Sequence, residues 1–187
     1  MSRNLKVVAV SGGLQYPSRT LTLVEEILVS LGALFPIEVR LIELSRIGPQ
    51  FAGVLSRAEL PKAVQEDIAA IENADLLIAA TPVYRASFTG LFKHLFDLVH
   101  HEALIDVPVL LAATGGSDRH ALVIEHQLRP LFSFFQALTL PVGVYATEAD
   151  FSNYQVSSPA LRLRIALAVE RAKPWLSHRD TTLSTTA

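Results

Sequence analysis

The most constraining feature of this chain is that short aliphatic runs alternate with longer amphipathic stretches over most of its length. The aliphatic runs predict five strands, and the stretches between and after them predict helices. The predicted strands lie near Leu5–Val10, Ile37–Leu44, Leu76–Ala80, Val109–Ala113 and Val142–Ala146, and the predicted helices near Thr20–Leu34, Pro61–Asn73, Phe88–His100, Arg119–Leu138 and Pro159–Leu176. Nearly continuous aliphatic strands are buried on both faces, so the pattern predicts a parallel sheet between two layers of helices.

This order of elements favours an α/β fold, namely a flavodoxin-like three-layer sandwich with five parallel strands in the order 2-1-3-4-5. In that order a mononucleotide binds at the carboxyl ends of the first and third strands, where the chain direction across the sheet reverses. No repeat or low-complexity linker interrupts the series, so residues 1–187 are expected to form one domain, with residues 177–187 as a flexible polar tail.

Composition narrows the possible functions. The net charge of -2 among 187 residues offers no general basic field, so neither nucleic acid nor an anionic membrane is expected as a partner. The absence of cysteine excludes disulfides, thiolate catalysis and cysteine metal sites. The N-terminus enters a strand at once, and no apolar run is long enough to span a bilayer, so a cytoplasmic protein is expected.

The loop from Ser11 to Thr20 follows the first predicted strand and leads into the first predicted helix. Its small residues permit a tight turn, and the start of a helix presents unpaired amides at its positive dipole end. Hydroxyl groups from Ser11, Ser18 and Thr20 and the guanidinium of Arg19 could complete a phosphate site. Taken alone, the loop fits an ordinary capped turn equally well. It matches neither Gly-x-Gly-x-x-Gly nor Gly-x-x-x-x-Gly-Lys-Ser/Thr.

Two further loops at the same predicted sheet edge carry suitable groups for a ligand. The third strand is followed by Thr81–Gly90, which contains Tyr84 and Arg85, and the fourth by Thr114–His120, which contains a Gly-Gly pair. Tyr84 could support a planar ligand, and Arg85 adds positive charge. Each loop alone could be a simple turn with packed side chains. Their occurrence on three consecutive crevice loops favours a flavin over an uncharged ligand.

The motifs Ser-Gly-Gly-x-x-x-Pro-Ser-Arg-Thr, Ala-Thr-Pro-Val-Tyr-Arg-Ala-Ser-Phe-Thr-Gly and Ala-Thr-Gly-Gly-Ser resemble those of the NAD(P)H-dependent FMN reductases with a flavodoxin-like fold. The resemblance covers Leu5 to Leu176. The chain is most similar to the members that supply alkanesulfonate or methanesulfonate monooxygenases, because Leu122–Leu131 follows their fourth-helix pattern. The resemblance implies hydride transfer to FMN from NADPH or NADH, with NADPH as the expected donor, and release of reduced FMN to a separate monooxygenase.

The resemblance also implies a set of residues that bind FMN without a covalent bond. The phosphate would be held by Ser11, Pro17, Ser18, Arg19 and Thr20; the flavin and ribityl chain would be lined by Pro82, Val83, Tyr84, Arg85, Ala86 and Ser87; and the ring would be approached by Thr114, Gly115, Gly116 and Ser117. No acid or base residue is required for hydride transfer. No metal is expected either, because the scattered histidines have no acidic cluster at ligand spacing.

The predicted helix Arg119–Leu138 contains a local anomaly. Pro130 lacks the amide that would bond to the carbonyl of His126, so the helix is expected to kink or to widen into a π-bulge. Members of the resembled subgroup carry such a widened turn, usually with tyrosine at the position of His126. The helix is also apolar around its circumference, which favours a homodimer or homotetramer through residues 119–138, with His126 near an intersubunit flavin site. A deeply buried core helix would explain the same pattern.

Two other functions use the same fold and ligand. A flavodoxin-like electron carrier would keep its FMN bound, but such carriers are strongly acidic, whereas this chain has 16 basic and 18 acidic residues. A quinone or azo-dye reductase with tightly bound FMN is the second alternative. Oxidation of NADPH with excess FMN, with and without a quinone, distinguishes these functions.

Overall fold

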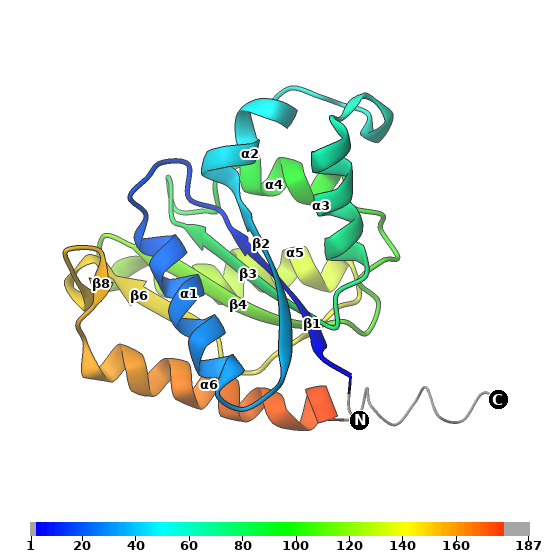
Figure 1. The fold of residues 1–187 in the computed structure, drawn as a ribbon. Coiled ribbons are helices and arrows are strands. Elements are labelled where there is room, and N and C mark those ends of the chain that lie inside the picture. The colour runs from blue at the N-terminus through cyan, green and yellow to red at the C-terminus, as the bar shows by residue number, and fades with distance from the viewer. Residues whose placement is uncertain (1–2, 178–187) are drawn as a thin grey trace.

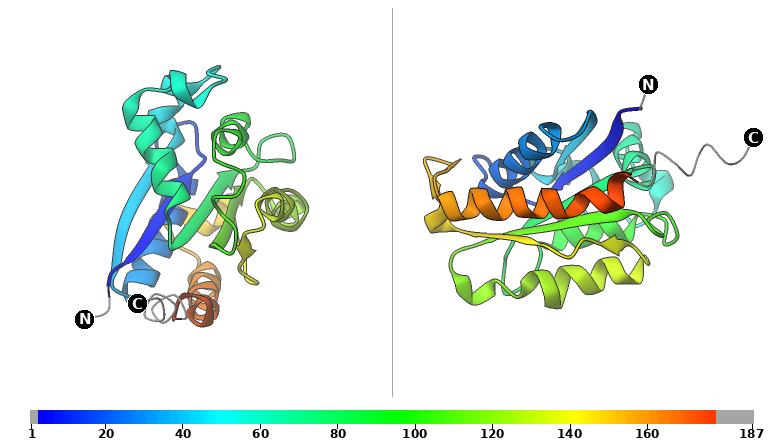
Figure 2. Two further views of the ribbon diagram at one scale, coloured as in Figure 1. Left: turned by 90° about the vertical axis from the view of Figure 1, so that its right-hand side faces the viewer. Right: turned by 90° about the horizontal axis from the view of Figure 1, so that it is seen from below.

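A computed structural model describes residues 3–177, in which a parallel sheet lies between two layers of helices (Figure 1, Figure 2). The strands of this sheet are β1 (Leu5–Ser11), β2 (Ile37–Glu43), β3 (Leu76–Pro82), β4 (Pro108–Gly115), β5 (Leu138–Thr139) and β6 (Val144–Thr147). Their order is β2-β1-β3-β4-β5, and β6 also pairs with β4. All these pairs are parallel, which confirms the predicted flavodoxin-like sandwich.

The helices cover the two faces of the sheet unequally. They are α1 (Arg19–Gly32), α2 (Leu44–Phe51), α3 (Lys62–Glu72), α4 (Gly90–Asp97), α5 (Arg129–Phe134) and α6 (Pro159–Ser177). Helices α1 and α6 cover one face, and α2 to α5 cover the other (Figure 2). On β1, Val7 and Ala9 pack with the first group, while Val8 and Val10 pack with the second. This alternation follows from the two-residue period of a strand and buries both faces.

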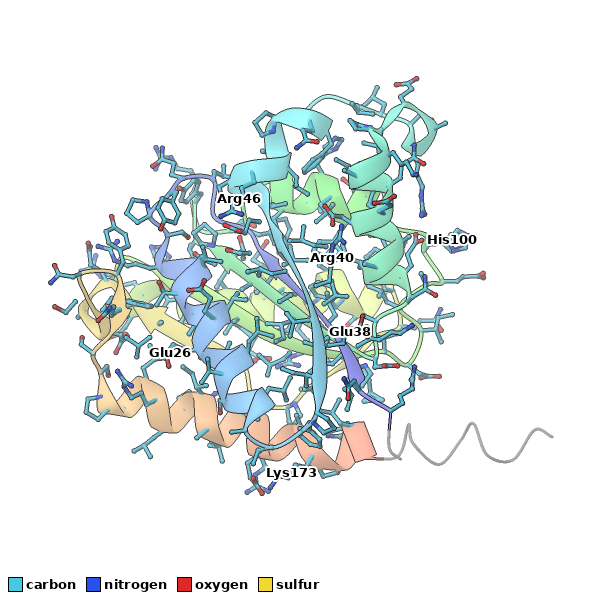
Figure 3. All side chains as sticks on the ribbon, viewed as in Figure 1. Glu26, Glu38, Arg40, Arg46, His100 and Lys173 are labelled. Atoms are coloured by element: carbon cyan, nitrogen blue, oxygen red, sulfur yellow. The ribbon has the colours of Figure 1, made fainter. Side chains whose placement is uncertain are left out.

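Strand β2 forms one edge of the sheet and is the least buried of the long strands. Its outer residues include Glu38 and Arg40, which lie along the exposed edge (Figure 3). The Arg40 guanidinium donates to Asp67 Oδ1 on α3 at 2.6 and 2.9 Å. Charged side chains on an edge strand oppose pairing with another chain, so this edge is protected against aggregation.

The fifth predicted strand, Val142–Ala146, is placed correctly beside β4 but has different bounds. It corresponds to β6, which pairs with Ala112–Gly115, while the additional short strand β5 lies where the predicted helix Arg119–Leu138 was expected to end and pairs with Pro108–Val109. Pro141 lies between the two segments and has no amide to donate to a strand ladder. Gly143 follows, and a Cβ there would lie 2.8 Å from the Ile124 side chain. The proline and the close packing at Gly143 together explain why pairing with β4 is interrupted between β5 and β6.

Helix α2 and a short hairpin after β6 are absent from the sequence prediction. The chain turns directly from β2 into α2 at Leu44, a residue that the prediction assigned to the strand. After β6, the strands β7 (Phe151–Ser152) and β8 (Gln155–Val156) form a short hairpin. Asn153 and Tyr154 make its turn with φ angles of 48° and 58°. The turn lacks the glycine that usually marks such conformations in a sequence, so the hairpin had no clear signal.

The segment predicted as one helix over Arg119–Leu138 is irregular. It comprises a 3₁₀ turn at Asp118–His120, a π-helix at Ile124–Leu128 and α5. The Arg129 amide donates to the Ile124 carbonyl, five residues back, just before Pro130 removes the next amide. This confirms the predicted widening at Pro130. The Arg129 guanidinium also bonds to Glu125 at 2.6 and 2.9 Å and holds the pKa of that carboxyl below its usual range.

The remaining helix boundaries are close to those predicted. Helix α4 ends at Asp97 rather than at the predicted His100, and it begins at Gly90 rather than at Phe88, because Thr89 caps it by accepting a hydrogen bond from the Phe92 amide at 3.3 Å. Ser177, the first residue of the predicted tail, is the last residue of α6, and residues 178–187 lie outside the described part of the chain. Within residues 3–177, no helix has the length and apolarity needed to cross a membrane.

Candidate functional site

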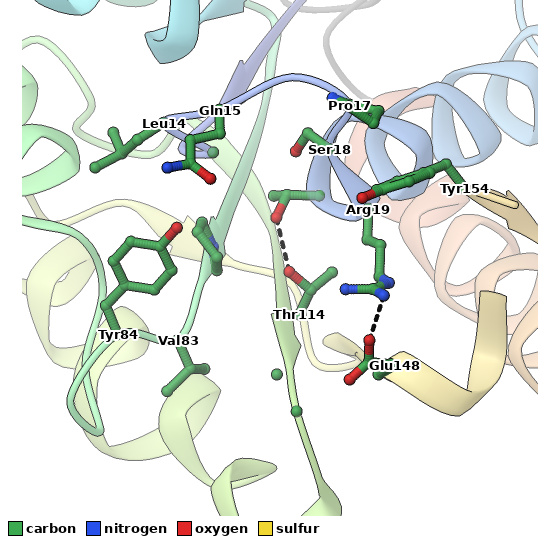
Figure 4. Close-up of a pocket in the computed structure, with 15 residues that line it drawn as sticks. Leu14, Gln15, Pro17, Ser18, Arg19, Val83, Tyr84, Thr114, Glu148 and Tyr154 are labelled. Atoms are coloured by element: carbon green, nitrogen blue, oxygen red, sulfur yellow. Dashed lines mark hydrogen bonds and ion pairs between the residues drawn. The ribbon is translucent and has the colours of Figure 1, made fainter.

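A cleft of about 260 Å³ opens at the carboxyl ends of β1, β3 and β4 (Figure 4). It is lined by Gly13, Leu14, Gln15, Pro17, Ser18, Arg19, Thr20, Pro82, Val83, Tyr84, Thr114, Gly115, Gly116, Glu148 and Tyr154. In Figure 4, Val83 and Tyr84 lie at one end and Arg19, Glu148 and Tyr154 at the other, with Thr114 between them. The fold therefore brings the three predicted loops together and separates an aromatic end from a charged end.

The turn between β1 and α1 passes unusually close to β3. The Gly12 amide donates to the Ala80 carbonyl at 2.7 Å, and the Thr89 hydroxyl donates to the Gly12 carbonyl at 3.2 Å. A Cβ on Gly12 would lie 2.9 Å from the Ala80 oxygen and 2.9 Å from the Phe92 ring. Only glycine permits this approach without displacement of backbone or core, so Gly12 determines the path of the loop.

The start of α1 is built to face an anion. Ser18 caps the helix by accepting a hydrogen bond from the Leu21 amide at 3.2 Å. Arg19 is the first residue of the helix, and the first turn contains no acidic residue that would offset the positive end of the helix dipole. The buried hydroxyl groups of Thr20 and Thr114 lie 2.7 Å apart and join this turn to the end of β4.

The charged end of the cleft is formed by Arg19 and two residues from beyond β6. The Arg19 guanidinium is ion-paired with the carboxylate of Glu148 and lies 5.4 Å from the centre of the Tyr154 ring (Figure 4). The Tyr154 carbonyl accepts a hydrogen bond from the Thr22 hydroxyl at 2.8 Å, which ties the hairpin tip to α1. Arg19 is therefore held from two sides.

The aromatic end is formed by the loop after β3. Tyr84 and Ser87 are joined by hydrogen bonds of 2.8 and 3.2 Å between their backbones, which closes a tight turn. Arg85 and Ala86 occupy the turn with φ angles of 51° and 66°, a strained conformation for residues other than glycine. The Ser87 hydroxyl donates to the Gln127 side chain at 3.0 Å, so the π-helix supports this loop.

The residues predicted to bind the cofactor divide into two groups. Those that line the cleft are Pro17, Ser18, Arg19, Thr20, Pro82, Val83, Tyr84, Thr114, Gly115 and Gly116, and those that do not are Ser11, Arg85, Ala86, Ser87, Ser117 and His126. Ser11 is buried in β1 with 2% of its surface exposed. Arg85 and Ala86 form the tip of their turn, and the Ser117 carbonyl accepts a hydrogen bond from Tyr145 at 2.7 Å.

Sequence reasoning missed five lining residues: Gly13, Leu14, Gln15, Glu148 and Tyr154. The first three lie in the Ser11–Thr20 loop, whose small and hydroxyl residues predict a phosphate site. Glu148 directly follows β6, whose carboxyl end reaches the same sheet edge, so the position of that strand was an available signal. No such signal pointed to Tyr154, because its position at the cleft depends on the short hairpin of β7 and β8.

The family model for NADPH-dependent FMN reductase matches residues 5–152. The chain belongs to this family. Its relatives include the NADH-dependent FMN reductase SfnF of Pseudomonas fluorescens (strain Pf0-1), which is 63% identical over 93% of each chain. The FMN reductase (NADPH) of Pseudomonas aeruginosa is 57% identical over 96% of this chain and 97% of that protein. The resemblance inferred from the three sequence motifs is thereby confirmed.

Solved structures of similar proteins agree with membership in the FMN reductase family. An oxidoreductase from Corynebacterium diphtheriae has a TM-score of 0.81 and 33% identity, covering 94% of this chain and 98% of that one. The apo form of the NADH:FMN oxidoreductase EMOB also has a TM-score of 0.81, with 29% identity over 91% of this chain and 90% of its own. These similarities cover more of the chain than residues 5–152, which the family model matches.

Replacing Gly115 with valine should weaken FMN binding about tenfold and destabilise the fold by about 1–2 kcal/mol. A Cβ at Gly115 would lie 2.0 Å from the Tyr145 hydroxyl, so Tyr145 must release the Ser117 carbonyl. Burial, with a smaller contribution from Asp118, raises the pKa of Tyr145 and keeps this donor protonated. Fluorescence titration with FMN and urea unfolding measure the two effects, with Tyr145→Phe as the control for loss of the hydrogen bond alone. Wild-type FMN affinity in Gly115→Val would contradict the role of this glycine.

Acid should destabilise the wild-type protein partly through Asp150, which anchors the turn that carries Glu148. Burial is the largest single influence on the pKa of Asp150 and by itself would raise it. Hydrogen bonds from Thr147 and Ser158 together outweigh burial, so the pKa of Asp150 lies below its usual range. The stabilisation from this lowered pKa is fully present at pH values above the pKa of Asp150 in the unfolded chain, which is ~4. It is lost as the pH falls through the pKa of Asp150 in the folded protein. Because Asp150 is only partly buried, we expect this contribution to be at most about 1 kcal/mol. In urea unfolding between neutral pH and pH ~3, Asp150→Asn should lose less stability than wild type, and equal losses would exclude this contribution.

Proposed function

We propose that this protein is an NAD(P)H:FMN oxidoreductase that supplies reduced FMN to a partner flavin-dependent monooxygenase, in alkanesulfonate or methanesulfonate sulfur assimilation. The observation that carries the proposal is the meeting of three family motifs in one cleft, with Arg19 and the start of α1 at one end and Tyr84 at the other. The relatives named FMN reductases, at 63% and 57% identity, support the reductase activity. The monooxygenase and the sulfur pathway rest on the resemblance of Leu122–Leu131 to one subgroup.

The residues present fit FMN. A phosphate suits the amides and hydroxyls around Ser18 and Thr20 and the guanidinium of Arg19. At the other end, nothing lies within 4 Å of the position of a Cβ on Gly116, which leaves room for a ring to approach the backbone. Tyr84 has 47% of its surface exposed and offers an aromatic face and edge there. The long cleft thus matches a ligand with an anionic end and a planar end.

The protein contributes binding and orientation to the reaction. When bound, FMN supplies the redox chemistry by accepting a hydride from the nicotinamide. Backbone and hydroxyl groups of Thr114, Gly115 and Gly116 would orient the flavin and stabilise negative charge on it, and Pro82 and Val83 would cover one side of it. Hydride transfer needs the two planar rings to be held in contact, so the shape of the cleft matters more than any acid or base.

The hydride donor is NADPH or NADH. The relative at 63% identity is named NADH-dependent, whereas the relative at 57% identity is named for NADPH. The preference for NADPH therefore stays a prediction. Parallel titrations of the purified protein with both nucleotides determine the ratio of their kcat/KM values.

We also propose that the protein is a cytoplasmic homodimer or homotetramer that associates through residues 119–138. Leu122 and Phe134 have 62% and 68% of their surfaces exposed on this segment. Leu128 and Phe132 are fully buried in the core, so only part of the apolar circumference needs a partner. His126, in the π-helix, would lie near the flavin of a neighbouring subunit. Light scattering that shows only monomers, with and without FMN, would exclude this assembly.

The decisive experiment follows NADPH and NADH oxidation by purified protein with excess FMN, with and without a quinone. We expect oxidation that depends on free FMN and reduced flavin that leaves the protein. Quinone-dependent oxidation with FMN retained would favour a quinone reductase. An absence of oxidation at any flavin concentration, with FMN bound, would favour an electron carrier instead.

A further inference from the structure

The charged end of the cleft contains an acid as well as a base. Among the described lining residues, Arg19 and Glu148 have the side chains that are charged at neutral pH, and the two are ion-paired. Their charges cancel, although a dianionic phosphate is bound best by a site with excess positive charge. A glutamate at the phosphate end is therefore unfavourable for the ligand that the rest of this end accommodates.

The position of Glu148 is built into the fold. It begins a 3₁₀ turn directly after β6, and this turn is closed by hydrogen bonds from the Thr147 amide and hydroxyl to Asp150 Oδ2 at 2.7 and 2.9 Å. On the other side of the pair, the Tyr154 ring lies over Arg19. The Glu148 side chain itself is 62% exposed, so it has room to move away from Arg19 when a stronger anion binds.

We propose that Glu148 sets the affinity of the site for FMN by competing with the flavin phosphate for Arg19, which keeps the flavin exchangeable. This inference rests on the proposed function. A phosphate must either displace the carboxylate or share the guanidinium with it, and in both cases the like charges repel. Riboflavin has no phosphate and escapes this competition. Glu148 therefore also reduces the preference of the protein for FMN over riboflavin.

A purely positioning role for Glu148 makes the opposite prediction. If the carboxylate served to orient Arg19 toward the phosphate, removing its charge would release the guanidinium into solvent and weaken FMN binding. The sign of the change in FMN affinity thus separates competition from positioning.

The test compares Glu148→Gln with Glu66→Gln, which removes the same charge from an exposed i,i+4 ion pair with Lys62 on α3. Dissociation constants for FMN and riboflavin are measured by fluorescence titration, and FMN release is followed after dilution. We expect Glu148→Gln to bind FMN about fivefold more tightly and to release it more slowly, because one partly screened like charge is removed. Riboflavin affinity should change less than about twofold, and Glu66→Gln should behave as wild type.

Inorganic phosphate provides a second probe that needs no bound flavin ring. It should compete with FMN more effectively in Glu148→Gln and in Glu148→Ala than in wild type. Unchanged or weaker binding of FMN in both variants would overturn the role of Glu148. Failure of the wild-type protein to bind FMN at all would instead count against the proposed function, so the two failures are distinguishable.

Discussion

Replacing Gly12 with alanine should destabilise the protein by about 3 kcal/mol, the upper range for inserting one methyl group into a packed site. The new Cβ would lie 2.9 Å from the Ala80 carbonyl oxygen, which is part of β3, and 2.9 Å from the Phe92 ring in the core. Neither neighbour is the free end of a flexible chain, so the loop must move instead. That movement breaks the 2.7 Å hydrogen bond from the Gly12 amide and shifts the phosphate end of the cleft.

Urea unfolding measures this loss, and Gly116→Ala is the matched control. A methyl group on Gly116 would have no neighbouring atom within 4 Å, and Gly116 does not require a positive φ, so its stability change should stay within about 0.5 kcal/mol. Failure of Gly12→Ala to fold, while Gly116→Ala folds normally, would be the extreme form of the same result. Equal stability of the two variants would show that the loop does not depend on the close approach to β3.

Replacing Arg19 with alanine should weaken FMN binding about 30-fold, while riboflavin binding changes less than about threefold. Charge-assisted hydrogen bonds to a phosphate contribute about 1.5–3 kcal/mol, and the substitution also leaves Glu148 unpaired at the phosphate end. Fluorescence titration with both flavins measures the effect. The FMN affinity of Arg19→Lys should lie between those of the wild type and Arg19→Ala, because lysine keeps the charge but lacks the planar pair of donors.

Arg171→Ala is the control for this experiment, since Arg171 is exposed on α6 and does not line the cleft. Combining Arg19→Ala with Glu148→Gln should recover part of the lost FMN affinity, because the unpaired carboxylate is then removed as well. Equal weakening of FMN and riboflavin by Arg19→Ala would place the phosphate elsewhere.

The sequence alone determined the layout of this protein. Aliphatic runs such as Leu76–Ala80 are too apolar to face water on either side, which requires a parallel sheet covered by helices. Pro130 could not supply the amide for His126, so the widened helix was also determined locally. The three loop motifs follow strands that end at one sheet edge, and their meeting in one cleft could therefore be predicted.

The tertiary structure decided which side chains share that cleft and with what charge. Ser87 turns to Gln127 and Ser117 presents its carbonyl to Tyr145, although both lie in motifs that resemble a flavin site. Glu148 reaches Arg19 across 129 positions of sequence. A local pattern specifies strands, turns and caps because these depend on neighbouring residues. The electrostatic balance of the phosphate end depends on contacts between distant segments, and only the folded chain brings those segments together.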